Sequence, residues 1–274
     1  MTKLTFKSKG ITRNRIIDAI DQRLEAWMSA QDFPAAMSRV ANHGGRLFDQ
    51  LVEELGRSIV LGVFPPGEPL SADRIIGEFG VSRSVVREVF RALETKGLIV
   101  ARPRVGTRVT SQENWNFLDP QVLNWRLLGP ERQKQISELF QTRSAIEPIA
   151  AKLAATSETA ALIATLESAV SMMRSALESR DVHAFTEADV LFHTVLLRAS
   201  GNMMFVRLEG ALRAALRARE SIFVPLTDRT RRGLDLHDAL IASLRSGDGP
   251  GAESTMRTLL AGAHEEVDGA VRPR

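Results

Sequence analysis

The chain has 274 residues, of which 44% are hydrophobic and 25% are charged, so it is long enough for two globular domains and does not have the composition of a disordered protein. It has no cysteine, which excludes disulfides and thiolate metal or redox sites. The sequence lacks an uninterrupted apolar run of about 18 residues and an apolar N-terminal signal segment, so we expect a cytoplasmic protein without a membrane partner.

The formal net charge is only +3, but the charges are unevenly distributed. Residues 1–116 carry 17 basic and 13 acidic side chains, and the remainder carries 19 basic and 20 acidic ones. The basic excess therefore lies in the first half, and a locally basic region is typical of a surface that contacts phosphates.

Residues 1–45 give the weakest pattern. Ile11 to Met28 has apolar side chains at helical spacing, and Asn42 to Gly45 then breaks that pattern. We expect an N-terminal extension that is either a helix packed on the body or a mobile basic tail.

The next segment has the pattern of three helices, the last two of which are short and joined by a tight turn. Leu47 to Leu61 is amphipathic and ends at Gly62, and Ser71 has the position of an N-cap for a helix that begins at Ala72. Gly80 then predicts a tight turn into a further helix. Two short helices joined by a glycine-containing turn, the second of them basic, are typical of a helix-turn-helix.

The second of these helices covers Ser82 to Gly97. Its apolar residues recur at i, i+3, i+4 and i+7, namely Val86, Val89, Phe90 and Leu93. Its first turns are polar and basic, with Ser82, Arg83, Ser84 and Arg87. An arginine fork fits guanine edges or phosphates, and serine allows a close approach, so this end predicts contact with DNA.

A β-hairpin is predicted directly after this helix. Leu98 to Ala101 and Thr107 to Thr110 flank a turn with Pro103 and Gly106. Between Arg74 and Arg108 there are eight basic and three acidic side chains. The hairpin thus has the position and charge of a wing beside a DNA-reading helix.

The stretch PPGEPLSADRIIGEFGVSRSVVREVFRALETKGLIVARPRVGTRV closely resembles the winged-helix DNA-binding domain of the GntR family of bacterial transcription regulators. Ile75 and Ile76 stand where many relatives have Glu-Leu. The resemblance implies that the residues in contact with operator DNA are Arg74, Ser82, Arg83, Ser84, Arg87, Arg104 and Gly106, with Gly106 at the tip of the wing in the minor groove.

Residues 113–130 separate this domain from the rest of the chain. The segment is rich in aromatic residues, including Trp115, Phe117 and Trp125, and predicts a linker that docks between domains.

From residue 131 to residue 270 the apolar spacing is helical throughout. We predict six helices, at 131–155, 158–179, 181–199, 202–222, 229–246 and 249–269. The expected fold is therefore mainly α, with a winged helix-turn-helix over 46–112 and an all-α bundle of six or seven helices over 131–270.

Five ionisable residues lie on faces of this bundle that should be buried. Arg143 and Glu147 share one helix, Asp189 and His193 are one turn apart on another, and His237 lies on a third. Burying such groups unpaired costs several kcal/mol, roughly, so they should contact one another, a metal or a ligand. A carboxylate and two imidazoles can hold a divalent transition metal, although a structural role is the alternative for each residue taken alone.

The segments ELFQTRSAIEPIAA, EADVLFHTVLLRASGN and LHDALIASLRSGD are similar to the FCD effector domain of one branch of GntR regulators. The resemblance implies a homodimer and a metal held by Asp189, His193 and His237, with zinc expected and nickel or manganese as alternatives. It also implies a pocket for a small carboxylate effector. The residues assigned to that effector are Arg143, Glu147, Arg213, Arg217 and Phe223.

One departure from the branch concerns the last helix. Many relatives supply a further histidine in a pattern like MRxHL, but the present MRTLL has Leu259 there, and His264 is out of register. The site is therefore expected to have three protein ligands. This departure and the linker make the chain most similar to galactonate-responsive repressors, which implies a sugar acid such as an aldonate as effector.

The function expected from these features is a ligand-responsive transcriptional regulator, a repressor of sugar-acid catabolism genes, and not an enzyme. Two alternatives remain open. The ligand can belong to another class, such as a dicarboxylate, an amino acid or an acyl thioester. A metal-dependent hydrolase is the other alternative, and for it the sequence offers no additional general base at a motif spacing.

Overall fold

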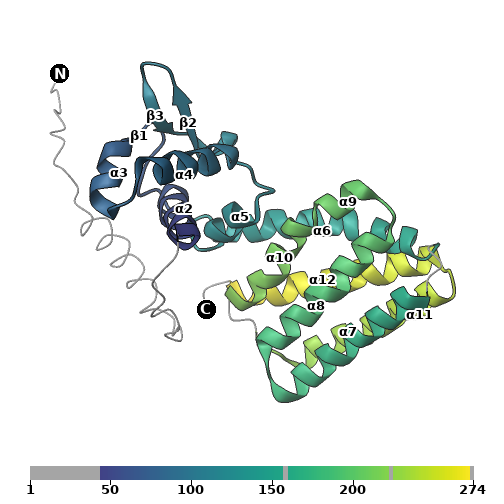
Figure 1. Ribbon diagram of the computed structural model, residues 1–274. Helices are drawn as coiled ribbons and strands as arrows, with labels where there is room; N and C mark the ends of the chain where they lie inside the picture. The colour runs from purple at the N-terminus through teal and green to yellow at the C-terminus, as the bar shows by residue number, and fades with distance from the viewer. Residues whose placement is uncertain (1–43, 157–159, 222–224, 272–274) are drawn as a thin grey trace, which may run out of the picture. The chain divides into compact units, whose positions relative to one another are not determined.

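The computed structural model describes residues 44–156, 160–221 and 225–271, and the chain divides into two compact units after Asn116 (Figure 1). Apart from its last two residues, the predicted N-terminal extension lies outside the described residues. Each unit has its own core and is described by itself.

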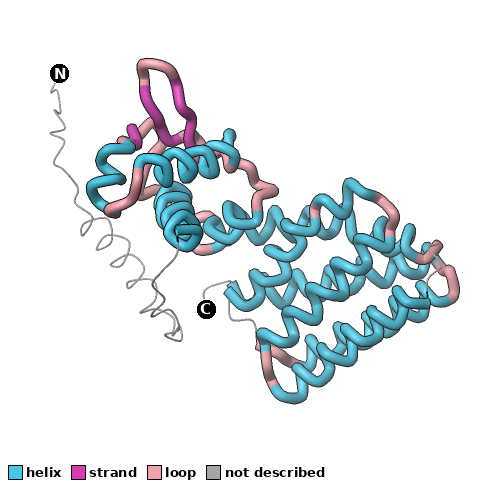
Figure 2. Tube along the Cα trace, viewed as in Figure 1, coloured by secondary structure: helices cyan, strands magenta, loops and turns pink. Residues whose placement is uncertain are grey.

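In its described residues, 44–116, the first unit combines three α-helices with a small sheet (Figure 2). Its elements are α2 (Gly44–Val60), β1 (Pro69–Leu70), α3 (Ala72–Phe79), α4 (Arg83–Thr95), β2 (Ile99–Arg102), β3 (Gly106–Val109) and the short 3₁₀ helix η1 (Gln112–Asn114). The strands are antiparallel in the order β1-β3-β2. The predicted winged helix-turn-helix is confirmed, and β1, which the sequence analysis did not predict, adds a third strand through the pair Pro69 and Arg108.

The turn between α3 and α4 forms as its residues predict. The Ser71 and Ser82 hydroxyls each accept a backbone N–H at 3.3 Å, from Arg74 and Val85, and so cap the two helices. Gly80 takes a left-handed conformation with φ 64°, which a glycine adopts without steric cost. Three of the four residues in the predicted apolar stripe of α4, Val86, Val89 and Leu93, are fully buried, and Phe90 is half-buried.

The second unit is all helical. Its helices are α5 (Pro120–Leu127), α6 (Arg132–Ala154), α7 (Ala160–Ser179), α8 (Val182–Ala199), α9 (Met203–Arg207), α10 (Glu209–Ser221), α11 (Asp228–Arg245) and α12 (Gly249–Val271). The single helix predicted over 202–222 is in fact two, α9 and α10. They are separate because the Leu208 N–H bonds to the Phe205 carbonyl at 3.0 Å, a tighter turn that ends α9.

The segment predicted as a linker is divided between the units. η1 belongs to the first unit, whereas α5 is part of the bundle, where Leu123 and Leu127 pack with Ile136 of α6 and Ala215 of α10. Asp119 begins α5 by accepting the N–H of Gln121 at 2.9 Å.

The centre of the bundle is formed by α6, α7, α8, α11 and α12. By length and composition α7 is apolar enough to cross a membrane. Its buried residues, however, pack against neighbouring helices, as Met173 does in one cluster with Phe192 of α8 and Leu240 of α11. One face of α7 is therefore part of the bundle core.

Candidate functional site

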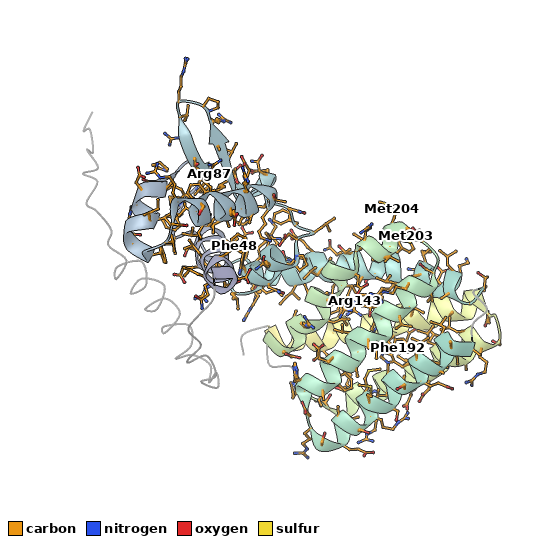
Figure 3. All side chains as sticks on the ribbon, in the orientation of Figure 1. Phe48, Arg87, Arg143, Phe192, Met203 and Met204 are labelled. Atoms are coloured by element: carbon orange, nitrogen blue, oxygen red, sulfur yellow. The ribbon has the colours of Figure 1, made fainter. Side chains whose placement is uncertain are left out.

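The first candidate site is the polar start of α4. Ser82, Arg83, Ser84 and Arg87 are all exposed, and Figure 3 labels Arg87. Arg83 forms an ion pair with Asp73 of α3 at 2.7 Å, but both side chains are more than 70% exposed. Such an exposed pair is worth about 0–1 kcal/mol, so an anionic partner can replace Asp73 at little cost.

The remaining residues expected at DNA are also on the surface of this unit. Arg74 is 43% exposed and pairs with Glu78 one turn later at 2.9 Å. In the β2–β3 turn, Arg104 and Gly106 are exposed and both have positive φ, 62° and 84°. The unit therefore offers a basic helix start and a basic hairpin, the groups with which proteins contact phosphates and base edges.

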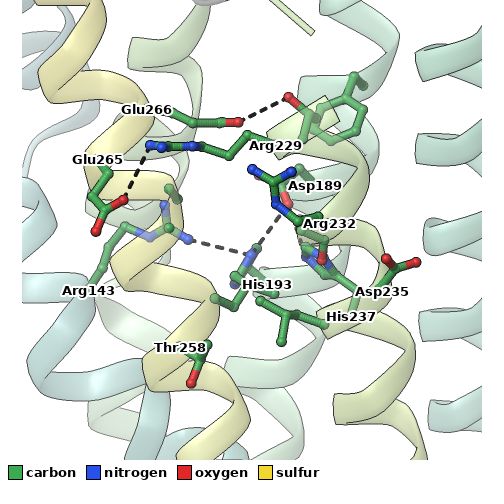
Figure 4. Close-up of a pocket in the computed structure, with 17 residues that line it drawn as sticks. Arg143, Asp189, His193, Arg229, Arg232, Asp235, His237, Thr258, Glu265 and Glu266 are labelled. Carbon is green, nitrogen blue, oxygen red and sulfur yellow. Dashed lines mark hydrogen bonds and ion pairs between the residues drawn. The ribbon is translucent and has the colours of Figure 1, made fainter. Parts of the chain in front are cut away.

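The second candidate site is a buried cluster in the bundle (Figure 4). Asp189 and His193 lie one turn apart on α8, and His237 comes from α11. Oδ1 of Asp189 is 3.4 Å from Nε2 of each histidine. One ligand atom from each residue lies within 4.8 Å of the others, so the three side chains could hold one metal ion.

Both imidazoles direct the same nitrogen toward Asp189. Nδ1 of His237 donates a hydrogen bond to the Gly233 carbonyl at 2.8 Å, and Nδ1 of His193 makes an ion pair with Glu147. Nε2 of His237 is buried and has no hydrogen-bond partner among the described residues. Metal-binding histidines are held in this way, with one nitrogen bonded to a carbonyl or carboxylate and the other turned to the ion, so the cluster fits a metal.

Glu147 links two cationic members of this region, Arg143 and His193. Its Oε1 accepts the Nε–H of Arg143 at 2.5 Å, and its other oxygen contacts His193. Glu147 is fully buried and does not line the cavity that Arg143 reaches. Its carboxylate is thus occupied by these two cationic groups and positions them, and contact between Glu147 and the effector stays a prediction.

The close contacts set the charges of the cluster. Burial by itself would raise the pKa of Glu147, but the charges of Arg143 and His193 lower it to about 2. Burial likewise opposes ionisation of Asp189, yet the neighbouring histidines hold its pKa well below the usual value. For His193, burial is outweighed by Glu147 and Asp189, which raise its pKa to about 9. The raised pKa favours the doubly protonated, cationic form of His193 at neutral pH in the metal-free cluster, and a metal that binds Nε2 must displace the proton there.

A cavity of about 530 Å³ opens onto the cluster. Arg143, Asp189, His193 and His237 line it together with residues of α11 and α12 that the sequence analysis did not identify, namely Arg229, Thr230, Arg232, Asp235, Thr258, Glu265 and Glu266. Two of those on α11, Arg229 and Thr230, could have been found by their spacing, because together with Gly233 they share the face of His237 at intervals of three or four residues.

Two predicted effector residues lie elsewhere. Neither Arg213 nor Arg217 of α10 lines the cavity. Arg213 is paired with Glu209 at 2.6 Å and Arg217 with Glu187 at 2.9 Å, while the alanines of α10 face the core. In this ligand-free structure the two side chains are thus bound by carboxylates outside the cavity, and their assignment to the effector stays a prediction. Phe223 lies outside the described residues.

The position that lacks a histidine does face the site. Leu259 is buried and lines the cavity, so a fourth protein ligand is replaced there by an apolar side chain. His264 is not among the lining residues, and its ring lies 5.0 Å from the ring of Phe140. Three protein ligands are therefore what the described residues offer.

Comparison with known proteins gives matches in both units. Residues 47–109 match the bacterial regulatory proteins of the gntR family, and residues 138–262 match the FCD domain. The chain is 34% identical over 215 residues to the galactonate operon transcriptional repressor of Escherichia coli K12, and the matched region covers 78% of this chain and 93% of that protein. It is 25% identical over 225 residues to the gluconate operon transcriptional repressor of Bacillus subtilis 168, which covers 79% and 81% of the two chains.

Among solved structures, the chain is similar to Lar, which controls expression of the Listeria monocytogenes agr system, with a TM-score of 0.56 and 18% identity over 86% of this chain and 100% of that one. This likeness shows the fold alone. The 34% identity to the galactonate operon repressor, over 93% of that protein, shows the family as well. The chain thus belongs to the gntR family of bacterial regulatory proteins, and it is a DNA-binding transcriptional regulator with an FCD domain, not an enzyme.

Proposed function

We propose that this regulator is a cytoplasmic homodimer that represses sugar-acid catabolism genes and leaves its operator when a small carboxylate effector binds the bundle. The observation that carries the proposal is the convergence of Asp189, His193 and His237 in a cavity that also contains Arg143, with one ligand atom from each of the three within 4.8 Å of the others. The names of the galactonate and gluconate relatives support a sugar acid, with an aldonate such as galactonate as the first candidate.

DNA recognition is assigned to the exposed groups of the first unit. Arg83 and Arg87 present guanidinium forks that can bind guanine edges or phosphates, while Ser82 and Ser84 allow a close approach. Arg74 is assigned to the phosphate backbone. In the wing, Arg104 and Gly106 are assigned to DNA contact.

Zinc is the metal proposed for the bundle, with nickel or manganese as alternatives. Asp189, His193 and His237 would hold it, a donor set that zinc accepts, and with Leu259 in place of a fourth ligand the site keeps open positions. When bound, the ion supplies positive charge and an open coordination position to an anionic ligand.

Arg143 is the residue proposed to bind the effector carboxylate. Its Nε is held by Glu147, and its Nη2 lies 3.4 Å from Nε2 of His193, so the guanidinium is fixed beside the cluster. A fixed guanidinium binds a carboxylate with little further loss of conformational freedom.

The effector's contacts involve three helices, because Arg143 lies on α6, Asp189 and His193 on α8, and His237 on α11. A ligand that touches all three favours one arrangement of these helices. For release from DNA, the effector must bind the arrangement that is incompetent for DNA more tightly, since equal affinity for both would shift nothing.

The proposal is tested with the purified protein and DNA from its own promoter region in a gel shift. We expect a retarded complex that disappears as an aldonate is added, and one equivalent of metal per chain in protein purified without added metal. A complex that persists at saturating concentrations of all aldonates, in protein that contains the metal, would refute the sugar-acid effector.

A further inference from the structure

The residue directly before the boundary between the two units is attached to the DNA-reading helix. Asn116, the last residue of the first unit, donates its backbone N–H to the carbonyl of Lys96 at 2.9 Å. Lys96 is the C-cap of α4. The first unit therefore ends in a hydrogen bond to the helix that we assign to operator recognition.

The residue directly after the boundary is attached to the bundle. The ring centroid of Phe117 lies 4.3 Å from Cζ of Arg126 on α5. A guanidinium within about 6 Å of a ring centroid is attracted to the face of that ring. Phe117 follows Asn116 in the chain, so only one peptide unit, which is planar and rigid, joins the two attached residues. A movement of Phe117 can therefore be passed to Asn116.

Arg126 connects Phe117 to α6. Its side chain is only 4% exposed, bonds to the Gln135 side chain and lies 3.3 Å from Glu138, and both of these residues are on α6. Its third contact is an ion pair with Glu131, the N-cap of α6, at 3.4 Å. Burial of a guanidinium is costly, and neither metal binding nor effector binding as proposed above uses this one. Its contacts fix the position of Phe117 relative to the start of α6.

The same helix carries the guanidinium assigned to the effector. Gln135, Leu139 and Arg143 follow one another at intervals of four residues, so they share one face of α6, and all three are buried. Gln135 and Arg143 are about 12 Å apart along the helix axis. Neither glycine nor proline lies between them, since Pro148 comes after Arg143. This part of α6 has none of the usual causes of a kink, and it should move as one segment when a ligand displaces Arg143.

We propose that Arg126 is the positioning residue that couples the effector site to the DNA-binding unit. A ligand that shifts α6 at Arg143 moves the partners of Arg126, and the contact between Arg126 and Phe117 transfers the shift to the chain beside Asn116. This inference rests on the proposed function, because it takes effector binding at Arg143 to oppose operator binding. It adds a residue that lies outside the effector cavity.

The test measures the coupling itself on the full chain saturated with zinc. Fluorescence anisotropy gives the dissociation constant of operator DNA with and without saturating galactonate, and the ratio of the two constants is the coupling ratio. Calorimetry gives the galactonate affinity of the DNA-free protein. We expect a coupling ratio of at least about fivefold in the wild type, the lower end of typical allosteric effects.

Arg126→Lys retains the positive charge but loses the planar group that stacks on the ring and forms several bonds at once. Its coupling ratio should fall below about twofold, while its affinity for operator without galactonate and its affinity for galactonate without DNA should each stay within about twofold of wild type. A purely structural role would change these two separate affinities instead.

A second variant leaves the buried charge in place. Phe117→Leu retains an apolar side chain at a position that is 37% exposed, yet loses the ring face, so it should also lower the coupling ratio. Arg174→Lys is the matched control. Arg174 of α7 likewise pairs with a neighbouring helix, through Asp238 of α11 at 2.7 Å, but it lies far along the chain from Asn116. It should retain the wild-type coupling ratio.

The outcomes separate this inference from the proposed function. If Arg126→Lys and Phe117→Leu bind galactonate and keep the wild-type coupling ratio, Arg126 does not couple the two sites and the inference is overturned. A loss of galactonate affinity in Phe117→Leu as large as its loss of coupling also overturns it, because the contact would then support the pocket. If galactonate does not weaken operator binding by the wild-type protein, the proposed function fails and the inference fails with it.

Discussion

The two units place their functional groups in opposite environments. In the first unit Arg83 and Arg87 are exposed, and the pair of Arg83 with Asp73 is more than 70% exposed on both sides. In the second unit Arg143, Glu147 and His193 are each at most 3% exposed. Exposed charges contribute little to folding, whereas buried charges depend on one another, so substitutions should separate function from stability in the first unit and couple them in the second.

The largest effect is expected at Glu147. Glu147→Gln removes the negative charge between Arg143 and His193. It leaves Arg143 without its carboxylate partner and His193 with Asp189 alone, which should cost roughly 3–5 kcal/mol of unfolding free energy. Urea denaturation of the zinc-free protein measures it. A loss below about 1 kcal/mol, the range of an exposed pair, would remove the contrast between the units.

Metal removal should have the next largest effect. A ligand at a hundred times its dissociation constant stabilises the folded state by about 2.7 kcal/mol, so chelation should lower the melting temperature of the wild-type protein. His237→Ala loses one of the three donors and should show a smaller shift on chelation, which makes it the matched comparison. Equal shifts in both proteins would mean that the metal binds somewhere else.

At the DNA-reading helix, function should change without stability. Arg87→Ala should weaken specific operator binding by about 1–3 kcal/mol. Its unfolding free energy should stay within about 0.5 kcal/mol of wild type, because the side chain is exposed. Fluorescence anisotropy on operator DNA and urea denaturation give the two quantities. Arg83→Lys sharpens the test, since it retains the charge but loses the bidentate fork.

The smallest effect is expected at Arg217. Its pair with Glu187 is 46% and 38% exposed on the two sides, and neither residue lines the cavity. Arg217→Ala should therefore change stability by about 0–1 kcal/mol. It should leave effector affinity, measured by calorimetry, unchanged. A large loss of affinity would return Arg217 to the pocket.

Local patterns in the sequence predicted much of this arrangement. The caps at Ser71 and Ser82 and the apolar stripe of α4 are short-range features, and the structure has them as predicted. The i,i+4 pair of Asp189 and His193 on an apolar face likewise indicated a buried cluster, because an unpaired charge there would be too costly.

The features that could not be predicted from the sequence depend on tertiary contacts. The strand β1 has only two residues and exists because Pro69 and Leu70 pair with β3, which lies far along the chain. The roles of Arg213 and Arg217 depend on which carboxylates the neighbouring helices bring close. In the same way, Glu265 and Glu266 reach the cavity only because α12 packs beside α11.

The most direct test of the central claim, that the buried cluster is where effector releases the protein from DNA, uses His193→Ala. Fluorescence anisotropy on operator DNA is titrated with the aldonate that releases the wild-type protein. We expect the variant to bind operator as wild type does, because His193 lies outside the DNA-binding unit, but to remain bound when the aldonate is added. Release of the variant at the same aldonate concentration as wild type would contradict the account and leave the cluster with a structural role.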